Sequence, residues 1–140
     1  MKLAITLSAL ALSATPALAQ EATGDASAGE TAFGQCAACH QVITPAGDKL
    51  AGMAQVGPNL YAVAGRTAGT VEGYAYSDGP IALGEAGVTW TEANFVEYVA
   101  DPNAFIQAKT DVTARSRMTY MLKDADTAKD IYAYLASLAE

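Results

Sequence analysis

Apolar residues recur with helical spacing near the end of the chain and predict its clearest helix. The apolar stripe repeats at intervals of three and four residues: Ala128, Ile131, Leu135 and Leu138. Asp124 has the chemistry of an N-cap, and the pattern continues to about Ala139. We therefore expect a C-terminal helix that buries one face.

A second apolar segment, residues 90–100, predicts a helix in the middle of the chain. Its buried face is apolar: Phe95, Val96 and Val99. Thr89 and Glu92 have the spacing of a capping box. Asp101 and Pro102 then end this helix and begin a shorter one, because an aspartate can cap a helix whose first residue is proline.

The first helix is predicted over residues 26–33, with Asp25 as its N-cap. Gly29 and Phe33 are four residues apart and share one face of it. Because glycine lowers helix propensity, we expect Gly29 to permit the close approach of another helix.

Two segments, residues 41–57 and 67–88, are rich in glycine and proline and are expected to be irregular loops. No stretch shows the alternation typical of a strand, so the predicted fold class is all-α. A loop as long as residues 67–88 is unusual in a compact domain unless it wraps around something.

The N-terminus has the features of a secretory signal. Lys2 precedes an apolar run over residues 3–14, which is too short to span a membrane. An A-x-A site predicts cleavage after Ala19. We expect residues 1–19 to be a cleaved signal peptide and residues 20–140 to be one domain; the alternative is a retained membrane anchor.

Charge makes some partners unfavourable. The full chain has 8 basic and 15 acidic residues, a net charge of −7, and removal of Lys2 makes it more negative. This balance argues against nucleic acid and anionic membranes as partners. Arg115, Arg117 and Lys123 flank Met118 and form either a local basic rim or part of a mixed surface.

The run Cys36-Ala37-Ala38-Cys39-His40 is the strongest chemical motif. In an exported chain, C-x-x-C-H indicates covalent haem attachment, with one thioether from each cysteine. The adjacent imidazole then suits the iron as an axial ligand. Three alternatives are a thioredoxin-like pair, half of a zinc site and a structural disulfide. The first lacks a βαβ setting, and the second lacks another cysteine or histidine.

The sixth iron position decides between an electron carrier and a ligand-binding protein. His40 is the only histidine, so two histidine ligands from one chain are excluded. Three methionines remain after cleavage, and Met118 is favoured over Met121 and Met53 because its loop can cross to the opposite haem face. The carbonyl of Pro58 is a candidate acceptor for the second ring nitrogen of His40.

These motifs, in this order, resemble a class I cytochrome c, most closely the long-chain bacterial cytochrome c2 type. The resemblance covers nearly the whole mature chain. It rests on seven stretches in addition to the haem motif: Gly29 with Phe33, residues 57–61, Gly65-Arg66, Tyr74-Ala75-Tyr76, Thr89-Trp90, residues 117–120 and residues 131–135.

The resemblance implies a fold in which the first and last helices cross at Gly29, with loops wrapped around one haem c. It implies that the haem is attached through Cys36 and Cys39, with His40 and Met118 as iron ligands. The remaining haem contacts that it implies are Pro58, Arg66, Tyr76 and Trp90.

The implied function is one-electron transport in the periplasm, without enzymatic activity, by a monomer. The donor would be a quinol-oxidising cytochrome complex, and the acceptor a photosynthetic reaction centre or a terminal oxidase. The chain departs from the family in its lysines, which are few after the leader: Lys49, Lys109, Lys123 and Lys129. The lysine ring that docks such proteins on acidic partners is therefore thin.

Two rivals belong to other classes. A gas sensor or peroxidase-like haem protein would need an open sixth position and a distal polar group, and no second histidine exists to serve. A haem subunit fixed in a larger complex would need a permanent interface.

Overall fold

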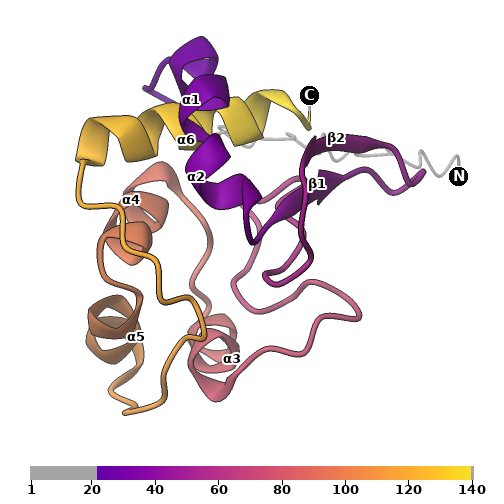
Figure 1. The fold of residues 1–140 in the computed structure, drawn as a ribbon. Coiled ribbons are helices and arrows are strands. Elements are labelled where there is room, and N and C mark those ends of the chain that lie inside the picture. The colour runs from indigo at the N-terminus through magenta and orange to yellow at the C-terminus, as the bar shows by residue number, and fades with distance from the viewer. Residues whose placement is uncertain (1–21, 140) are drawn as a thin grey trace, which may run out of the picture.

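The computed structural model describes residues 22–139, which form a helical domain with one small sheet at its side (Figure 1). In chain order the elements are α1 (Ala26–Ala32), α2 (Gly34–Ala37), β1 (Gln41–Ile43), β2 (Lys49–Gly52), α3 (Asp78–Glu85), α4 (Glu92–Ala100), α5 (Pro102–Thr110) and α6 (Ala125–Ser137). The predicted signal peptide, residues 1–19, lies outside the described residues. Within 22–139, no helix has the length and apolar character needed to cross a membrane.

Helices α1 and α6 cross in direct contact (Figure 1), as Gly29 predicted. A β-carbon at Gly29 would lie 1.9 Å from the carbonyl oxygen of Asp130 and 2.9 Å from Cβ of Tyr134. Phe33 and Tyr134 pack beside the crossing with ring centroids 5.6 Å apart. Asp25 caps α1 as expected, and its own amide donates to Oδ1 of Asp130 at 2.7 Å.

Replacing Gly29 with alanine is expected to lower the free energy of unfolding by about 3 kcal/mol, because the new methyl group forces two packed helices apart. Denaturant unfolding of the haem-loaded protein measures this. Gly34→Ala is the matched control, since nothing lies within 4 Å of a β-carbon there. Equal losses in both variants would contradict the tight crossing.

The two middle helices are present, but the predicted capping box is wrong. Helix α4 starts at Glu92, and its N-cap is Thr91, whose side chain accepts a hydrogen bond from the amide of Asn94 at 3.2 Å. Thr89 is held extended by a bridge to Thr67. The carboxylate of Glu92 instead accepts two hydrogen bonds from Thr23. In α5 the predicted cap is confirmed, because Asp101 accepts from the amide of Ala104 at 3.1 Å.

Helix α3 lies inside residues 67–88, which the sequence predicted to be irregular. Its glycines lower helix propensity and conceal it in the sequence, but they serve close packing. A β-carbon at Gly79 would lie 2.7 Å from Cδ1 of Ile106, and one at Gly84 would lie 2.4 Å from the carbonyl oxygen of Ala68. Tertiary contact, rather than propensity, therefore stabilises α3.

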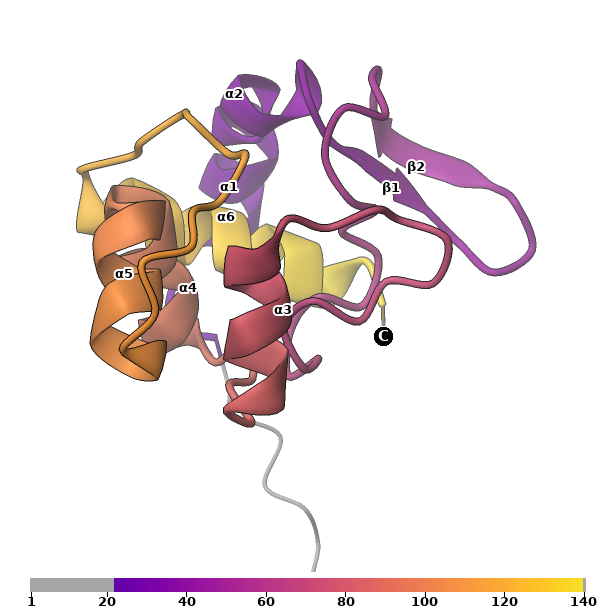
Figure 2. The same cartoon turned by 90° about the horizontal axis from the view of Figure 1, so that it is seen from below.

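The expectation of no strands is also corrected, because β1 and β2 form an antiparallel hairpin. It extends to one side of the helices (Figures 1 and 2). Gln41 and Val42 are both buried, so β1 shows no alternation, and each strand is too short to display a period.

Two hydrophobic clusters form the interior of residues 22–139. The larger joins α1, α4 and α6, and the smaller joins α3 and α5, which lie beside each other (Figure 2). Trp90 and Tyr98 pack against both clusters. The predicted apolar face of the last helix is confirmed, since Ala128, Ile131 and Leu135 are fully buried and Asp124 accepts from the amide of Thr127.

Candidate functional site: a covalent haem site

Helix α2 carries Cys36, and the turn that follows it carries Cys39 and His40. The amides of Cys39 and His40 both donate to the carbonyl oxygen of Cys36, at 3.0 and 2.9 Å. Both cysteines are free, with Cys36 half-buried and Cys39 exposed. Burial, assisted by the neighbouring Cys39, raises the pKa of the Cys36 thiol to about 11. Cys36 therefore carries its proton at neutral pH.

The His40 ring is held by its backbone neighbours. Its Nδ1 lies 2.8 Å from the carbonyl oxygen of Pro58, the hydrogen bond that the sequence suggested. Because a carbonyl can only accept, Nδ1 carries the proton and Nε2 keeps its lone pair. Burial lowers the pKa of His40, an effect that the Pro58 hydrogen bond opposes, so the neutral ring is favoured at pH 7.

Gly57 and Asn59 explain why Pro58 sits where it does. A β-carbon at Gly57 would lie 2.4 Å from Cε1 of His40, so the backbone packs directly on the ring. The side chain of Asn59 accepts from the amide of Ile43 at 2.9 Å and donates to its carbonyl at 2.7 Å. This double hydrogen bond ties the loop to the last residue of β1.

Arg66, Tyr76 and Trp90 come together from three distant parts of the sequence. The amide of Trp90 donates to the carbonyl of Arg66 at 2.9 Å. Burial raises the pKa of Tyr76, and the hydrogen bond from Val71 and the half-buried guanidinium of Arg66 oppose the shift. The phenol oxygen of Tyr76 accepts a hydrogen bond from the amide of Val71, so its proton is free to be donated. The group suits an anionic ligand such as a carboxylate.

Met118 is half-buried, whereas the other two methionines of residues 22–139 are exposed. It packs against the larger hydrophobic cluster, whereas Met53 is 81% exposed and Met121 is 49% exposed. The order of preference drawn from the sequence thus agrees with burial. Arg117, the preceding residue, donates from Nη1 to the carbonyl of Ala75 at 3.1 Å, which fastens this segment to the loop before α3.

Tyr98 and Ser116 are site residues that the sequence reasoning missed. The hydroxyl of Tyr98 lies 2.7 Å from Oγ of Ser116, and that oxygen accepts from the amide of Met118 at 3.0 Å. Burial raises the pKa of Tyr98, and the Ser116 hydrogen bond opposes the shift. Tyr98 could have been found from its position in the sequence, because it lies about two turns after Trp90 on the same face of the predicted helix.

We expect the Tyr98 and Ser116 hydroxyls to stabilise the protein as a pair. Tyr98→Phe, Ser116→Ala and the double variant should give a coupling free energy of about 1 kcal/mol in a denaturant-unfolding cycle. Tyr132→Phe removes a different hydrogen bond, to the carbonyl of Trp90, and should combine additively with Ser116→Ala. Additivity in both cycles would contradict the pairing.

The chemistry of these residues fits a covalently bound haem. The motif offers two unpaired thiols and one neutral imidazole whose second nitrogen is already fixed. Cys36 and Cys39 are free in this structure, and within residues 22–139 no group of three or more Cys, His, Asp or Glu suited to a metal exists, so the zinc alternative lacks ligands.

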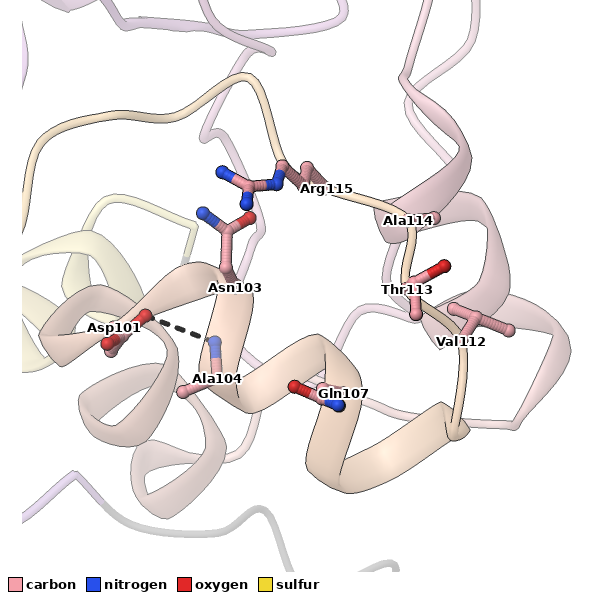
Figure 3. Close-up of a pocket in the computed structure, with 8 residues that line it drawn as sticks. All are labelled: Asp101, Asn103, Ala104, Gln107, Val112, Thr113, Ala114 and Arg115. Carbon is pink, nitrogen blue, oxygen red and sulfur yellow. Dashed lines mark hydrogen bonds between the residues drawn. The ribbon is translucent and has the colours of Figure 1, made fainter.

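A separate hollow of about 470 Å³ lies between α5 and residues 112–115 (Figure 3). None of the predicted site residues lines it. Its edges hold the segment that leads to Met118: the amide of Ser116 donates to Oδ1 of Asn103 at 3.1 Å, and Ser77 donates to the carbonyl of Arg115 at 2.8 Å. The residues around the hollow therefore help to hold the segment that leads to Met118.

Comparison with known proteins finds close relatives, although no protein-family model matches. The chain is 50% identical over 120 residues to the cytochrome c2 of Rhodovulum adriaticum, which covers 84% of this chain and 95% of that protein. It is 46% identical over 132 residues to the cytochrome c-551 of Roseobacter denitrificans, covering 94% and 91%. The crystal structure of cytochrome c2 from Rhodobacter sphaeroides superposes with a TM-score of 0.79 at 44% identity, covering 83% of this chain and 97% of that one. The fold expected from the resemblance is thereby confirmed.

Proposed function

The chain belongs to the class I cytochromes c of the cytochrome c2 type, and from this membership we propose that it carries single electrons between redox complexes in the bacterial periplasm. Such carriers hold one covalent haem c and are not enzymes. The observation that carries the proposal is the Cys36-x-x-Cys39-His40 motif with its histidine fixed by Pro58.

Cys36 and Cys39 attach the cofactor. Each would hold the haem through one thioether to a vinyl group of the porphyrin. The haem, when bound, supplies one-electron iron chemistry between the ferric and ferrous states.

His40 and Met118 are the residues that would hold the haem iron. The free lone pair on Nε2 of His40 is available to the iron, and the Pro58 hydrogen bond makes the ring a better donor. The thioether of Met118 is soft and neutral, and it favours ferrous iron. Two ligands supplied by the protein would limit rearrangement at the iron on gain or loss of one electron, which suits a carrier.

Arg66, Tyr76 and Trp90 are the proposed contacts of the haem propionates. Arg66 also donates from its guanidinium to the carbonyls of Tyr61 and Asn59, at 2.7 and 3.1 Å. These bonds keep a positive charge in a half-buried position, where it would offset a negative propionate.

We infer the periplasmic location from the signal-like N-terminal segment. We expect purified protein exported from a bacterial host to begin at Gln20, with the mass of residues 20–140 plus one haem. Intact-mass measurement and N-terminal sequencing check this. A mature protein that still carries the apolar run of residues 3–14 would contradict cleavage and favour the membrane anchor.

The proposed donor is a quinol-oxidising cytochrome complex, and the proposed acceptor is a photosynthetic reaction centre or a terminal oxidase. The ligand-binding or peroxidase-like alternative is not supported, since the close relatives are named as cytochromes c2, c-550 and c-551.

The carrier function is tested by electron counting. Reduced protein should give up one electron per haem to ferricyanide, return fully to its starting spectrum on reduction, and bind no carbon monoxide. Rapid carbon monoxide binding by wild-type protein, with incomplete electron recovery, would favour the ligand-binding alternative.

A further inference from the structure

Three segments around the haem-attachment cysteines contain no charged side chain: residues 34–39, 50–65 and 118–122. We call their exposed surface the uncharged face. We propose that this face docks a redox protein whose own contact surface is apolar and nearly uncharged. The inference deepens the carrier function proposed above and rests on it.

Hydrogen bonds bring the three segments together beside α2. The amide of Met53 donates to the carbonyl of Ala37 at 3.1 Å, and the amide of Gly57 donates to the carbonyl of Cys39 at 2.8 Å. The hydroxyl of Tyr120 donates to the side chain of Gln35. Residues 50–65 and 118–122 therefore both lie next to the turn that carries the attachment cysteines.

The apolar side chains of this face are open to solvent. Met53 is 81% exposed, Val56 69%, Met121 49% and Tyr120 44%. Exposed apolar residues gathered in one place mark interaction sites far more often than scattered ones do. Cys39 is exposed among them, so the point of cofactor attachment lies at this surface.

The charges bordering the face are few and of both signs. Exposed Arg117 directly precedes residues 118–122, and its Nη1 donates to the carbonyl of Ala75. Lys49 follows Asp48 and Lys123 precedes Asp124 along the chain, so each of these exposed lysines has an exposed acid as its sequence neighbour. The other two lysines are paired elsewhere, Lys109 with Glu97 and Lys129 with Asp126, each at 3.6 Å.

The net negative charge of the chain also favours a partner surface of low charge. A chain of net charge −7 is repelled by a strongly acidic partner, and no lysine ring around Cys39 opposes that repulsion. Short-range apolar contact is the interaction that this face offers, and it fits a partner surface of low charge. A small contact of this kind also suits rapid release after electron transfer.

The test uses haem-loaded protein on gold electrodes that carry either methyl-terminated or carboxylate-terminated thiol monolayers. We expect a reversible one-electron wave on the methyl surface, changing less than about twofold between about 10 mM and about 0.5 M salt. Val56→Lys should lower the electroactive coverage there by on the order of tenfold, because a lysine ammonium loses water on contact with methyl groups. Ile81→Lys is the matched control: Ile81 is 42% exposed but lies on α3, outside the face, and should leave coverage unchanged.

Three results would overturn the inference. The first is preferential binding to the carboxylate surface that weakens steeply with salt. The second is equal behaviour of Val56→Lys and Ile81→Lys. The third is a wild-type dimer in sedimentation that Val56→Lys dissociates, since a second copy would then be the occupant. Failure of the carrier function looks different: no reversible reaction with ferricyanide in free solution.

Discussion

Replacing both Cys36 and Cys39 with serine is expected to yield a chain without covalent haem that has lost its cooperative fold. Side chains from both hydrophobic clusters are left half-buried around the site, among them Leu60, Trp90 and Met118. The cofactor would cover this apolar surface, and small domains depend on such additions. We expect the free energy of unfolding to fall by about 5 kcal/mol or more, which is the whole stability of a marginal domain.

Far-ultraviolet circular dichroism and intact mass measure the two effects together. Cys39→Ser alone is the control, because Cys36 can still form one thioether and most of the fold should remain. A haem-free double variant that unfolds cooperatively, with the midpoint of the loaded wild type, would contradict the dependence of the fold on the cofactor.

Replacing Met118 with alanine is expected to have the largest effect on redox chemistry. Loss of the thioether removes a ligand that favours ferrous iron, so the reduction potential should fall. A hundredfold loss of that preference corresponds to a decrease of about 120 mV for a one-electron couple. The variant should also bind cyanide or carbon monoxide readily, because the sixth position becomes open.

Met121→Ala and Met53→Ala are the matched controls for the potential. Met53 is 81% exposed and Met121 49%, so both are more exposed than half-buried Met118. Their potentials should stay close to that of the wild type in a spectroelectrochemical titration. If the reduction potential fell strongly in Met121→Ala and stayed unchanged in Met118→Ala, Met121 and not Met118 would be the ligand.

Local signals in the sequence predicted the helices well where a cap and an apolar stripe agreed. Asp25, Asp101 and Asp124 each cap the helix that they were expected to begin. The hydrogen bond between His40 and Pro58 and the crossing of α1 and α6 at Gly29 could also be predicted, since each depends on one residue with a specific chemical property.

Elements stabilised by distant contacts could not be predicted in this way. Helix α3 contains two glycines that fit against Ile106 and Ala68, and nothing local marks it as helical. The capping box failed because Thr89 is paired with Thr67, far away in the sequence. The link from Tyr98 through Ser116 to Met118 was missed for the same reason, because its two hydroxyls are 18 residues apart.

The central claim is that His40 and Met118 together hold a six-coordinate iron in an electron carrier. The visible spectrum of the oxidised protein tests it most directly, through the weak far-red charge-transfer band of a sulfur–iron bond. We predict that wild type and Met121→Ala show this band and that Met118→Ala does not. A wild-type spectrum without the band, with high-spin features, would contradict the claim and mean an open iron.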